Sequence, residues 1–396
     1  MIRVLLVVFA CLASGSTAFA GEREEAMNRV GAWFKIFDAA LDHWTVTVPD
    51  GTDQRVLMTR KVAIAGVDKR VLVVYPRKSS AYDVAMTQLL ADFAVKPLNA
   101  TFTAAHYGND PTRGAQLVAE IERERYDLVY AMGSESIAFL HERFPAIGVP
   151  VVSVCAKDPV QLGQMPDYER GSGSNYAFTS LNLIVAVQIA YLRELKPGLR
   201  NLAVLVDAKN VSAVETQSRP IVAAARALGI DAFEVAVSDP RNAAAELERL
   251  LPETVATMRR SDPQLEHSLI WITGSTSVFT EIATINRLSD RVPVLSVVPD
   301  VVQQGGDSAV LSIGVGFESN AQLAAIYGAD ILAGRARAGD LKVGIVSPPD
   351  IAVNFRRAAE IGLRIPFRFF EAATFVYDRD GKPVRLRGQD VGPGGS

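Results

Sequence analysis

Short apolar runs alternate with longer amphipathic stretches along most of the chain. The runs are rich in β-branched residues and lack polar alternation, as is typical of parallel strands covered on both faces. They span residues 71–75, 128–131, 149–154, 202–206, 269–273 and 292–298. Helical patterns between them span residues 82–93, 111–124, 136–144, 180–195, 214–228, 243–258 and 278–288. This spacing of βαβ units predicts an α/β fold with two doubly wound parallel-sheet halves.

Three further segments frame these halves. Residues 21–68 form an N-terminal extension, with helical spacing over residues 29–43, a strand-like alternation and a Pro-Asp-Gly turn signal. The Gly-Ser-Gly-Ser stretch at residues 171–174 is a candidate crossover between the halves. Residues 371–396 are expected to form a C-terminal hairpin and tail, with the hairpin turn at residues 378–382.

The first twenty residues are typical of a signal peptide. Arg3 supplies a positive start, an apolar run follows, and the Ala-Phe-Ala sequence ending at Ala20 has small residues where a signal peptidase reads. A lipoprotein cleaved before Cys11 is the alternative, and it fits less well because Phe9 stands where a small residue is usual. We therefore expect cleavage after Ala20 and a periplasmic location.

The composition of the 396 residues limits the possible functions. With 49% hydrophobic and 21% charged residues the chain is typical of a globular protein of about two domains. The net charge of -3 gives no reason to expect a nucleic acid or an anionic membrane as partner. The four histidines share no metal-ligand spacing, and no acid, base or nucleophile set stands out. No metal, cofactor or enzymatic activity is expected.

Four stretches carry motifs with a defined order. They are a strand followed by the turn Lys157-Asp158-Pro159-Val160, a helix, proline loop and strand over residues 192–206, a helix ending in Ile331-Leu332-Ala333-Gly334, and an Asn-x-x-x-Ala-x-x-x-Gly-x-x-x-Pro pattern from Asn354 to Pro366. Together they resemble the ABC-transporter substrate-binding family that includes tryptophan- and tyrosine-binding members. The resemblance covers residues 70–366, and its last pattern is the most specific.

The resemblance implies a type I periplasmic-binding-protein fold, in which two lobes hold a ligand in the cleft between them. It places residues 69–172 and 308–345 in lobe 1, and residues 173–307 and 346–370 in lobe 2. It also implies that the protein is the solute-binding component of an ABC importer, acting as a monomer on a small molecule and on permease subunits. A sensory binding protein that signals to a receptor kinase is the alternative, because the sequence does not separate the two.

The ligand site is expected among the polar residues directly after the strands. In open parallel sheets, ligands bind outside the carboxyl ends of the strands, where helix N-termini point N–H groups into the crevice. The expected ligand-binding residues are Ser79, Tyr82, Ser134, Glu135, Ser136, Asp158, Asp207, Asn210, Thr273, Ser275, Thr276 and Asp300. For each Ser, Thr, Asp or Asn among them, helix capping is the simpler alternative role.

The chemistry of these residues indicates a small polar or zwitterionic ligand, such as an amino acid. Hydroxyl groups and N–H groups at helix starts suit a carboxylate, and Asp158, Asp207 or Asp300 suits an amine. Asp300 is the first choice, because it follows the last strand of the predicted second lobe. Tyr82 or Tyr176 is expected to cover an apolar part of the ligand, with core packing as the alternative for either.

Overall fold

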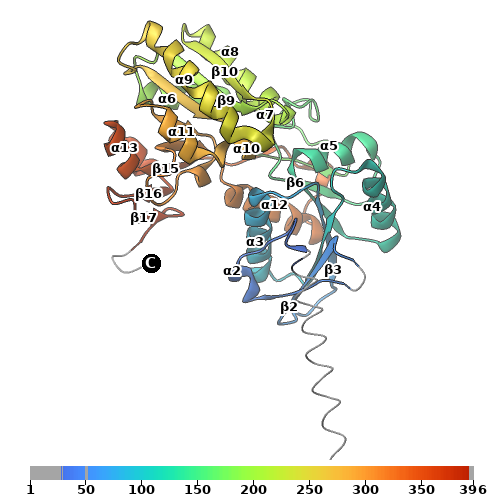
Figure 1. Ribbon diagram of the computed structural model, residues 1–396. Helices are drawn as coiled ribbons and strands as arrows, with labels where there is room; N and C mark the ends of the chain where they lie inside the picture. Colours follow the sequence, from blue (N-terminus) through green and yellow to red (C-terminus); the bar gives the residue numbers. More distant parts are fainter. Residues whose placement is uncertain (1–27, 29, 50–51, 392–396) are drawn as a thin grey trace, which may run out of the picture. The chain divides into compact units, whose positions relative to one another are not determined.

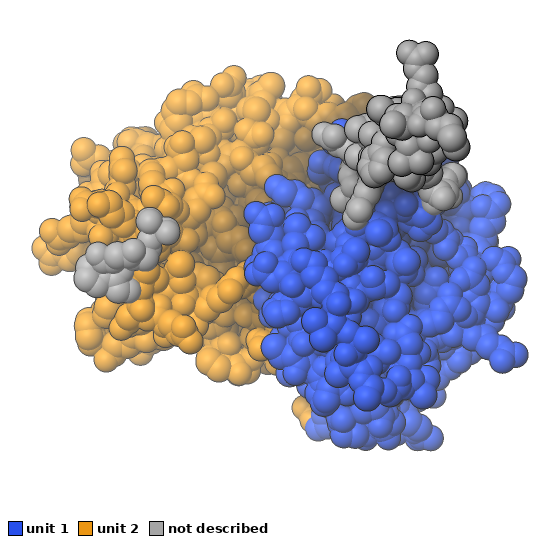
Figure 2. Space-filling model, turned by 90° about the horizontal axis from the view of Figure 1, so that it is seen from below, with its two compact units in different colours: residues 1–155, 170–178, 324–342 blue, residues 156–169, 179–323, 343–396 orange. Residues whose placement is uncertain are grey.

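The chain folds into two units, each built around its own sheet. A computed structural model describes residues 28, 30–49 and 52–391. Unit 1 contains residues up to 155 together with 170–178 and 324–342, and unit 2 contains residues 156–169, 179–323 and those from 343 onward (Figure 2). The predicted signal peptide lies outside the described residues, and so does the end of the predicted tail from residue 392.

Unit 1 contains a seven-stranded sheet in the order β1-β2-β4-β3-β5-β6-β7. Its strands are β1 (Trp44–Thr47), β2 (Arg55–Arg60), β3 (Lys69–Tyr75), β4 (Ala100–His106), β5 (Leu128–Met132), β6 (Val151–Val154) and β7 (Tyr176–Ala177). Its helices are α2 (Asp38–Leu41), α3 (Ser80–Val95), α4 (Pro111–Glu124), α5 (Gly133–Arg143) and the short η4 (Ala338–Asp340). The pairs from β4 to β7 are all parallel, as the apolar runs predicted.

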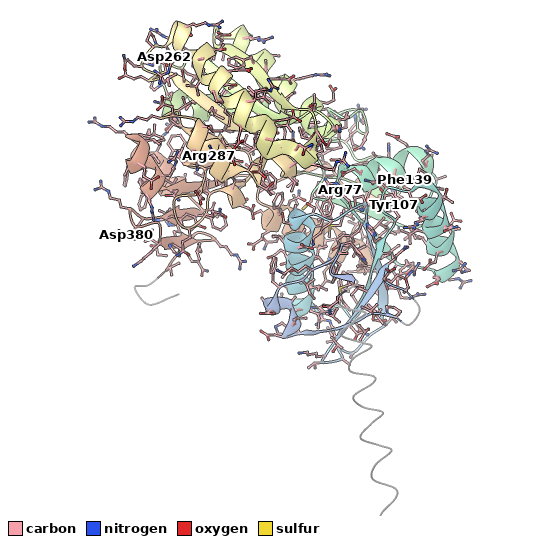
Figure 3. The ribbon with its side chains drawn as sticks, in the orientation of Figure 1. Arg77, Tyr107, Phe139, Asp262, Arg287 and Asp380 are labelled. Atoms are coloured by element: carbon pink, nitrogen blue, oxygen red, sulfur yellow. The ribbon has the colours of Figure 1, made fainter. Side chains whose placement is uncertain are left out.

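The burial of the strand residues and the right-handed crossover connections explain how the helices cover this sheet. All five residues of β5 and the last five of β3 are buried, so both faces need a cover. Because the strand order reverses after β4, right-handed crossovers place α3 on one face and α4 with α5 on the other. Gly114 of α4 lets Phe139 of α5 approach, since a Cβ there would lie 2.4 Å from that ring. Phe139 also stacks on Tyr107, with ring centroids 5.3 Å apart (Figure 3).

The N-terminal extension adds strands to unit 1. β1 and β2 form an antiparallel hairpin, and β2 pairs antiparallel with β4. The helix predicted over residues 29–43 is shorter than expected, because over residues 31–43 only α2 is helical. Trp33 is instead buried against Tyr75 and stacks on His106 with ring centroids 5.1 Å apart. Ring packing at the ends of β3 and β4 thus holds this stretch in an irregular conformation.

Unit 2 contains a nine-stranded sheet in the order β10-β9-β11-β12-β13-β15-β16-β17-β18, and β14 pairs with β8 in a second sheet. The strands are β8 (Thr179–Ser180), β9 (Asn201–Asp207), β10 (Asp231–Val237), β11 (Ser268–Ile272), β12 (Val294–Ser296), β13 (Leu311–Gly314), β14 (Gly344–Ile345), β15 (Asp350–Asn354), β16 (Phe375–Tyr377), β17 (Pro383–Leu386) and β18 (Gln389–Asp390).

The helices of unit 2 form two groups. α6 packs on α8, and α9 packs on α10 and α11, while α8 and α9 both contact β9 and β10 (Figure 1). The helical segments are α6 (Val185–Leu195), α7 (Val211–Ala213), the π-helical η1 (Val214–Ser218), α8 (Arg219–Ala227), η2 (Pro240–Asn242), α9 (Ala243–Ser261), α10 (Thr276–Phe279), α11 (Ile282–Leu288), η3 (Pro299–Val301), α12 (Phe317–Leu332), α13 (Phe355–Ile361) and α14 (Phe367–Ala372). The chain passes into unit 1 within α12.

Lobe 1 corresponds to unit 1 and lobe 2 to unit 2, but four segments lie in the other unit from the one predicted. Residues 308–323 lie in unit 2 because β13 pairs with β12 and β15, and residues 343–345 lie there because β14 pairs with β8. Residues 156–169 also lie in unit 2, whereas residues 173–178 lie in unit 1 because β7 pairs with β6. Apolar periodicity identifies strands, but backbone pairing decides which sheet they join.

The C-terminal hairpin is present where the sequence predicted it. β16 and β17 are antiparallel, and the Asp378 N–H donates to the Lys382 carbonyl oxygen at 2.8 Å. β16 is also parallel to β15, so the hairpin and β18 extend the sheet of unit 2. We call β16 to β18 the C-terminal ribbon.

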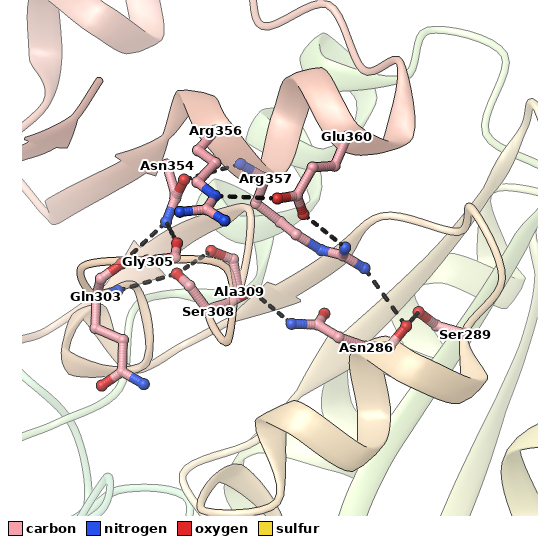
Figure 4. A network of polar contacts seen from close by, with 10 residues as sticks. All are labelled: Asn286, Ser289, Gln303, Gly305, Ser308, Ala309, Asn354, Arg356, Arg357 and Glu360. Carbon is pink, nitrogen blue, oxygen red and sulfur yellow. Dashed lines mark hydrogen bonds and ion pairs between the residues drawn. The ribbon is translucent and has the colours of Figure 1, made fainter. Parts of the chain in front are cut away.

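A buried asparagine ties the start of α13 to the loop before β13 (Figure 4). The Asn354 Nδ2 donates to the carbonyl oxygens of Gln303 and Gly305, each at 2.9 Å. Its Oδ1 accepts the N–H of Arg357 at 2.9 Å and so caps the helix. This residue opens the closing pattern of the sequence, and its three bonds explain why an asparagine suits the position.

Replacing Asn354 with alanine should lower the free energy of unfolding by about 1–3 kcal/mol, because the change removes a helix cap and two carbonyl partners. Arg356→Ala in the same helix is the matched control. It removes only an exposed ion pair with Glu360 and should cost less than about 1 kcal/mol. Urea unfolding measures both variants, and equal midpoints would contradict the role given to Asn354.

Candidate functional site

The strand order creates one switch point in each unit. The parallel strands follow the orders β4-β3-β5-β6-β7 and β10-β9-β11-β12-β13. In both units, the second of these strands along the chain pairs on one side of the first strand, and the third strand pairs on the other side. The switch points therefore lie between β3 and β5 and between β9 and β11. Ligands of open parallel sheets bind outside the carboxyl ends of the strands at such points. Ligand contacts are therefore expected in the loops that follow these four strands.

At the switch point of unit 1, Glu135 joins the two loops. Its Oε1 accepts from Arg77 Nε at 2.7 Å and its Oε2 from the Tyr82 hydroxyl at 3.2 Å; Figure 3 labels Arg77 in the loop after β3. Burial disfavours the charged form of Glu135, but the arginine and the hydrogen bonds outweigh it, and the pKa of Glu135 is lowered. The carboxylate thus stays ionised at neutral pH.

Gly133 makes the close approach of Tyr82 possible. Gly133 has a φ of +76°, and a Cβ there would lie 1.9 Å from the Tyr82 hydroxyl oxygen. Any larger residue would strain the backbone and push the hydroxyl away from Glu135. The glycine therefore fixes a ring and a carboxylate beside each other at the start of α5.

The three predicted serines of unit 1 stand near the same strand ends but differ in role. Ser79 precedes α3 and Ser134 lies in the first turn of α5, and both are buried. Ser136 is fully buried, and its Oγ donates to the Val74 carbonyl oxygen at 3.3 Å, so it supports β3. Tyr176 belongs to the core, where its hydroxyl donates to two backbone carbonyl oxygens at 2.7 Å each. Core packing is thus the correct alternative for Tyr176.

At the switch point of unit 2, Asp207 joins the loops after β9 and β11. Its Oδ2 accepts from Ser277 Oγ at 2.7 Å and its Oδ1 from the Lys209 N–H at 2.8 Å. Ser275 Oγ accepts the Asp207 N–H at 3.3 Å and lies 3.1 Å from Thr273 Oγ1. Ser275 and Thr273 are fully buried, so their hydroxyls hold the two strand ends together.

The other predicted residues of this unit form local bonds. Asn210 caps α7, which confirms the capping alternative there, and Thr276 is the half-buried first residue of α10. Asp158 accepts two N–H groups of its own turn through Oδ1 and the Tyr168 hydroxyl through Oδ2 at 2.6 Å. Both oxygens of Asp158 are therefore engaged within the 156–169 loop.

Lys157, Gln217 and Gly274 form a cluster that was not among the predicted ligand-binding residues. Gln217 Oε1 accepts the Gly274 N–H at 2.7 Å, and a Cβ on Gly274 would lie 2.3 Å from Lys157 Nζ. Gln217 belongs to the π-helical η1, an irregularity that is frequent at functional sites. Neither the π turn nor the close approach leaves a periodic pattern. The available signal was the position of Lys157 directly after a predicted strand.

Asp300 lies in a different set of contacts, beside a cavity of about 210 Å³ within unit 2. The cavity is bounded by the loop after β12, the first turn of α12 and β16, and no other predicted site residue lines it. Three aromatic rings line it: Phe317, Phe375 and Tyr377. None of the three was among the predicted ligand-binding residues, and the segment that holds Phe375 and Tyr377 was predicted only as a hairpin.

The electrostatic surroundings of Asp300 are acidic. Asp300 is an exposed residue, yet protein atoms surround its carboxyl group closely, and the resulting loss of solvation raises its pKa to about 6. The carboxylates of Glu318 and Asp350 raise this pKa further, while backbone N–H groups, including that of Phe317, act in the opposite direction. The Asp300 carboxylate is thus ionised at neutral pH, and its negative charge attracts cations.

In the part of the chain that the structure describes, no three His, Cys, Asp or Glu side chains gather as a metal site would require. Over those residues, no helix combines the length and apolarity needed to span a bilayer.

Comparisons with known proteins rest on structure alone, since no protein-family model and no curated protein matches the sequence. A conserved domain protein from Vibrio cholerae O1 biovar El Tor is 18% identical, covers 78% of this chain and 99% of its own, and has a TM-score of 0.61. An ABC domain from Streptococcus pneumonia in complex with L-Trp is 16% identical, covers 78% and 100%, and has a TM-score of 0.60.

A third solved structure is a substrate-binding protein with adhesive properties from Clostridium difficile, in its ligand-free, open form. It is 16% identical, covers 75% of this chain and 96% of its own, and has a TM-score of 0.56. The strand order of both units and these similarities lead to one conclusion: this chain has the type I periplasmic-binding-protein fold of ABC substrate-binding proteins.

Proposed function

We propose that this protein is the periplasmic solute-binding component of an ABC importer and binds a small polar or zwitterionic solute. One observation carries the proposal, and it occurs in both units. A carboxylate joins the two loops at each switch point, Glu135 in unit 1 and Asp207 in unit 2. Carboxylates, hydroxyls and helix-start N–H groups thus gather where open parallel sheets bind ligands.

An amino-acid-like solute fits this chemistry. A carboxylate can accept an ammonium group in a charge-assisted hydrogen bond, and N–H groups at the starts of α3 and α5 favour an anionic group. The similar Streptococcus domain was solved with L-Trp, which supports the same class of solute here.

The mechanism requires no chemical change in the solute. Contacts from both units favour a closed state over an open one, and permease subunits then bind the closed form. Converting a mostly open population to a mostly closed one needs roughly 10⁴-fold tighter binding to the closed state. Hydrogen bonds to charged groups contribute about 1.5–3 kcal/mol each, so two to four of them suffice. A small zwitterion offers that number, whereas an apolar solute of the same size does not.

Export through the cleaved signal peptide is part of the proposal. We expect the mature chain to begin after Ala20, because the small residues before that bond suit a signal peptidase. The intact mass of the exported protein measures the cleavage site. A mass that includes residues 1–20, or a lipid-bearing chain that begins at Cys11, would contradict this expectation.

The function is tested with the solute that the protein carries. Mass spectrometry after denaturation should recover a small zwitterionic molecule, and adding it back should decrease the radius of gyration in small-angle scattering. Glu135→Gln should weaken its binding at least about tenfold, because one charged hydrogen-bond acceptor is lost. Glu142→Gln, an exposed position on the same helix, is the matched control and should bind normally.

Two results would contradict the proposal. A bound solute that leaves the radius of gyration unchanged at saturation would exclude closure as the mechanism. Recovery of a chemically altered solute after incubation would indicate an enzyme instead of a binding protein.

A further inference from the structure

The volume of the cavity beside Asp300 limits the size of the ligand that it can bind. This volume is about 210 Å³. An apolar cavity of about 150 Å³ is large enough to hold benzene, whereas complete drug-sized ligands occupy about 300 Å³ or more. The cavity therefore admits one ring or one branched group with a few further atoms.

The charges around the cavity leave Asp300 as the carboxylate available to a ligand. Arg387 of the C-terminal ribbon binds both oxygens of Glu318, with Nε at 2.7 Å and Nη2 at 2.5 Å. Asp350 Oδ2 accepts the Gly316 N–H at 2.9 Å. Among the described residues, no lysine or arginine forms an ion pair with Asp300, and none is a cause of its shifted pKa.

The walls decide which cation fits. Three of the residues that line the cavity, Phe317, Phe375 and Tyr377, are aromatic, and aromatic faces attract organic cations through their quadrupoles. Inorganic cations need several oxygen ligands to replace their water. The described residues offer no group of three metal-binding side chains here. An alkylated or aryl-substituted ammonium group can place its carbon atoms against the rings and its charge against the carboxylate.

We propose that this cavity binds a small organic cation, with the ammonium group against Asp300 and the carbon atoms against Phe317, Phe375 and Tyr377. Two of the three rings come from β16, and the arginine that holds Glu318 comes from the same ribbon. The ribbon lies outside residues 70–366, the stretch that resembles the transporter family. The ribbon thus contributes two of the aromatic residues of the site and the partner of Glu318.

The test of this site is separate from that of the transport function, because the cavity lies within unit 2 and neither Glu135 nor Asp207 lines it. Binding of choline and benzylamine to the full chain is measured by calorimetric titration. The neutral analogues 3,3-dimethyl-1-butanol and benzyl alcohol serve as charge controls. At least one cation should bind saturably, and its neutral analogue should bind at least about tenfold more weakly, because the charged contact is absent.

Variants locate the binding. Asp300→Asn keeps the shape and removes the charge, so affinity for the cation should fall at least about tenfold. Asp307→Asn is the matched control, an exposed aspartate in the same loop that does not line the cavity, and it should bind as the wild type does. Tyr377→Leu should weaken the cation more than the neutral analogue, because only the cation uses the ring quadrupole.

The dependence on pH provides a second readout. The pKa of Asp300 is about 6, so the binding form is present above that pH and is lost below it. Affinity should fall roughly tenfold from about pH 7.5 to about pH 5 in the wild type and stay flat in Asp300→Asn. Glu318, Asp350, Tyr377 and Arg387 are the other titratable groups near Asp300, and this variant retains them all. No saturable binding of either cation, or equal affinity of wild type and Asp300→Asn, would overturn the proposal.

Discussion

Parallel strand pairing determines where the polar side chains of each unit come together. Two parallel neighbours cannot be joined by a tight turn, so the chain must cross the sheet through a helix between them, and the crossovers share one hand. The carboxyl ends of β3 and β5 therefore meet at one edge, as do those of β9 and β11. Glu135 reaches Arg77, and Asp207 reaches Ser277, only because of this arrangement. The polar chemistry of each unit is thus a consequence of how its backbone hydrogen bonds are satisfied.

Segments outside the repeated halves change the surroundings of these sheets without changing their order. The N-terminal hairpin adds two antiparallel strands beside β4, and Trp33 covers the ends of β3 and β4. The C-terminal ribbon adds three strands beyond β15 and supplies two of the rings around the cavity next to Asp300. Both additions pair with the edge strand of a sheet, whose outer N–H and C=O groups would otherwise lack backbone partners. A common fold in this way gains contacts that its relatives need not share.

The sequence predicted the fold class and most of the buried strands, whereas the ligand-binding residues stay a prediction. Continuous apolar runs identified β3, β5, β6, β9, β11 and β12, because a strand buried on both faces has no polar alternation. Unit membership was wrong for residues 308–323, because the pairing of β13 with β15 leaves no local signal. Among the predicted ligand-binding residues, Glu135 and Asp207 lie at the switch points and bind side chains from the neighbouring segment, whereas Ser136 and Thr273 are buried supports of the strands. Gln217 could not be found, because its position depends on a π turn and on a glycine that tolerates Lys157.

The proposed function requires the solute to bind at the switch points. Backbone hydrogen exchange, followed by mass spectrometry with and without the solute that the protein carries, tests it most directly. The account predicts slower exchange in the loops after β3, β5, β9 and β11, since ligand contacts there reduce local opening. The hairpin of β1 and β2 should exchange at the same rate in both states. Protection confined to that hairpin, or unchanged exchange in all four loops at saturating solute, would contradict the account.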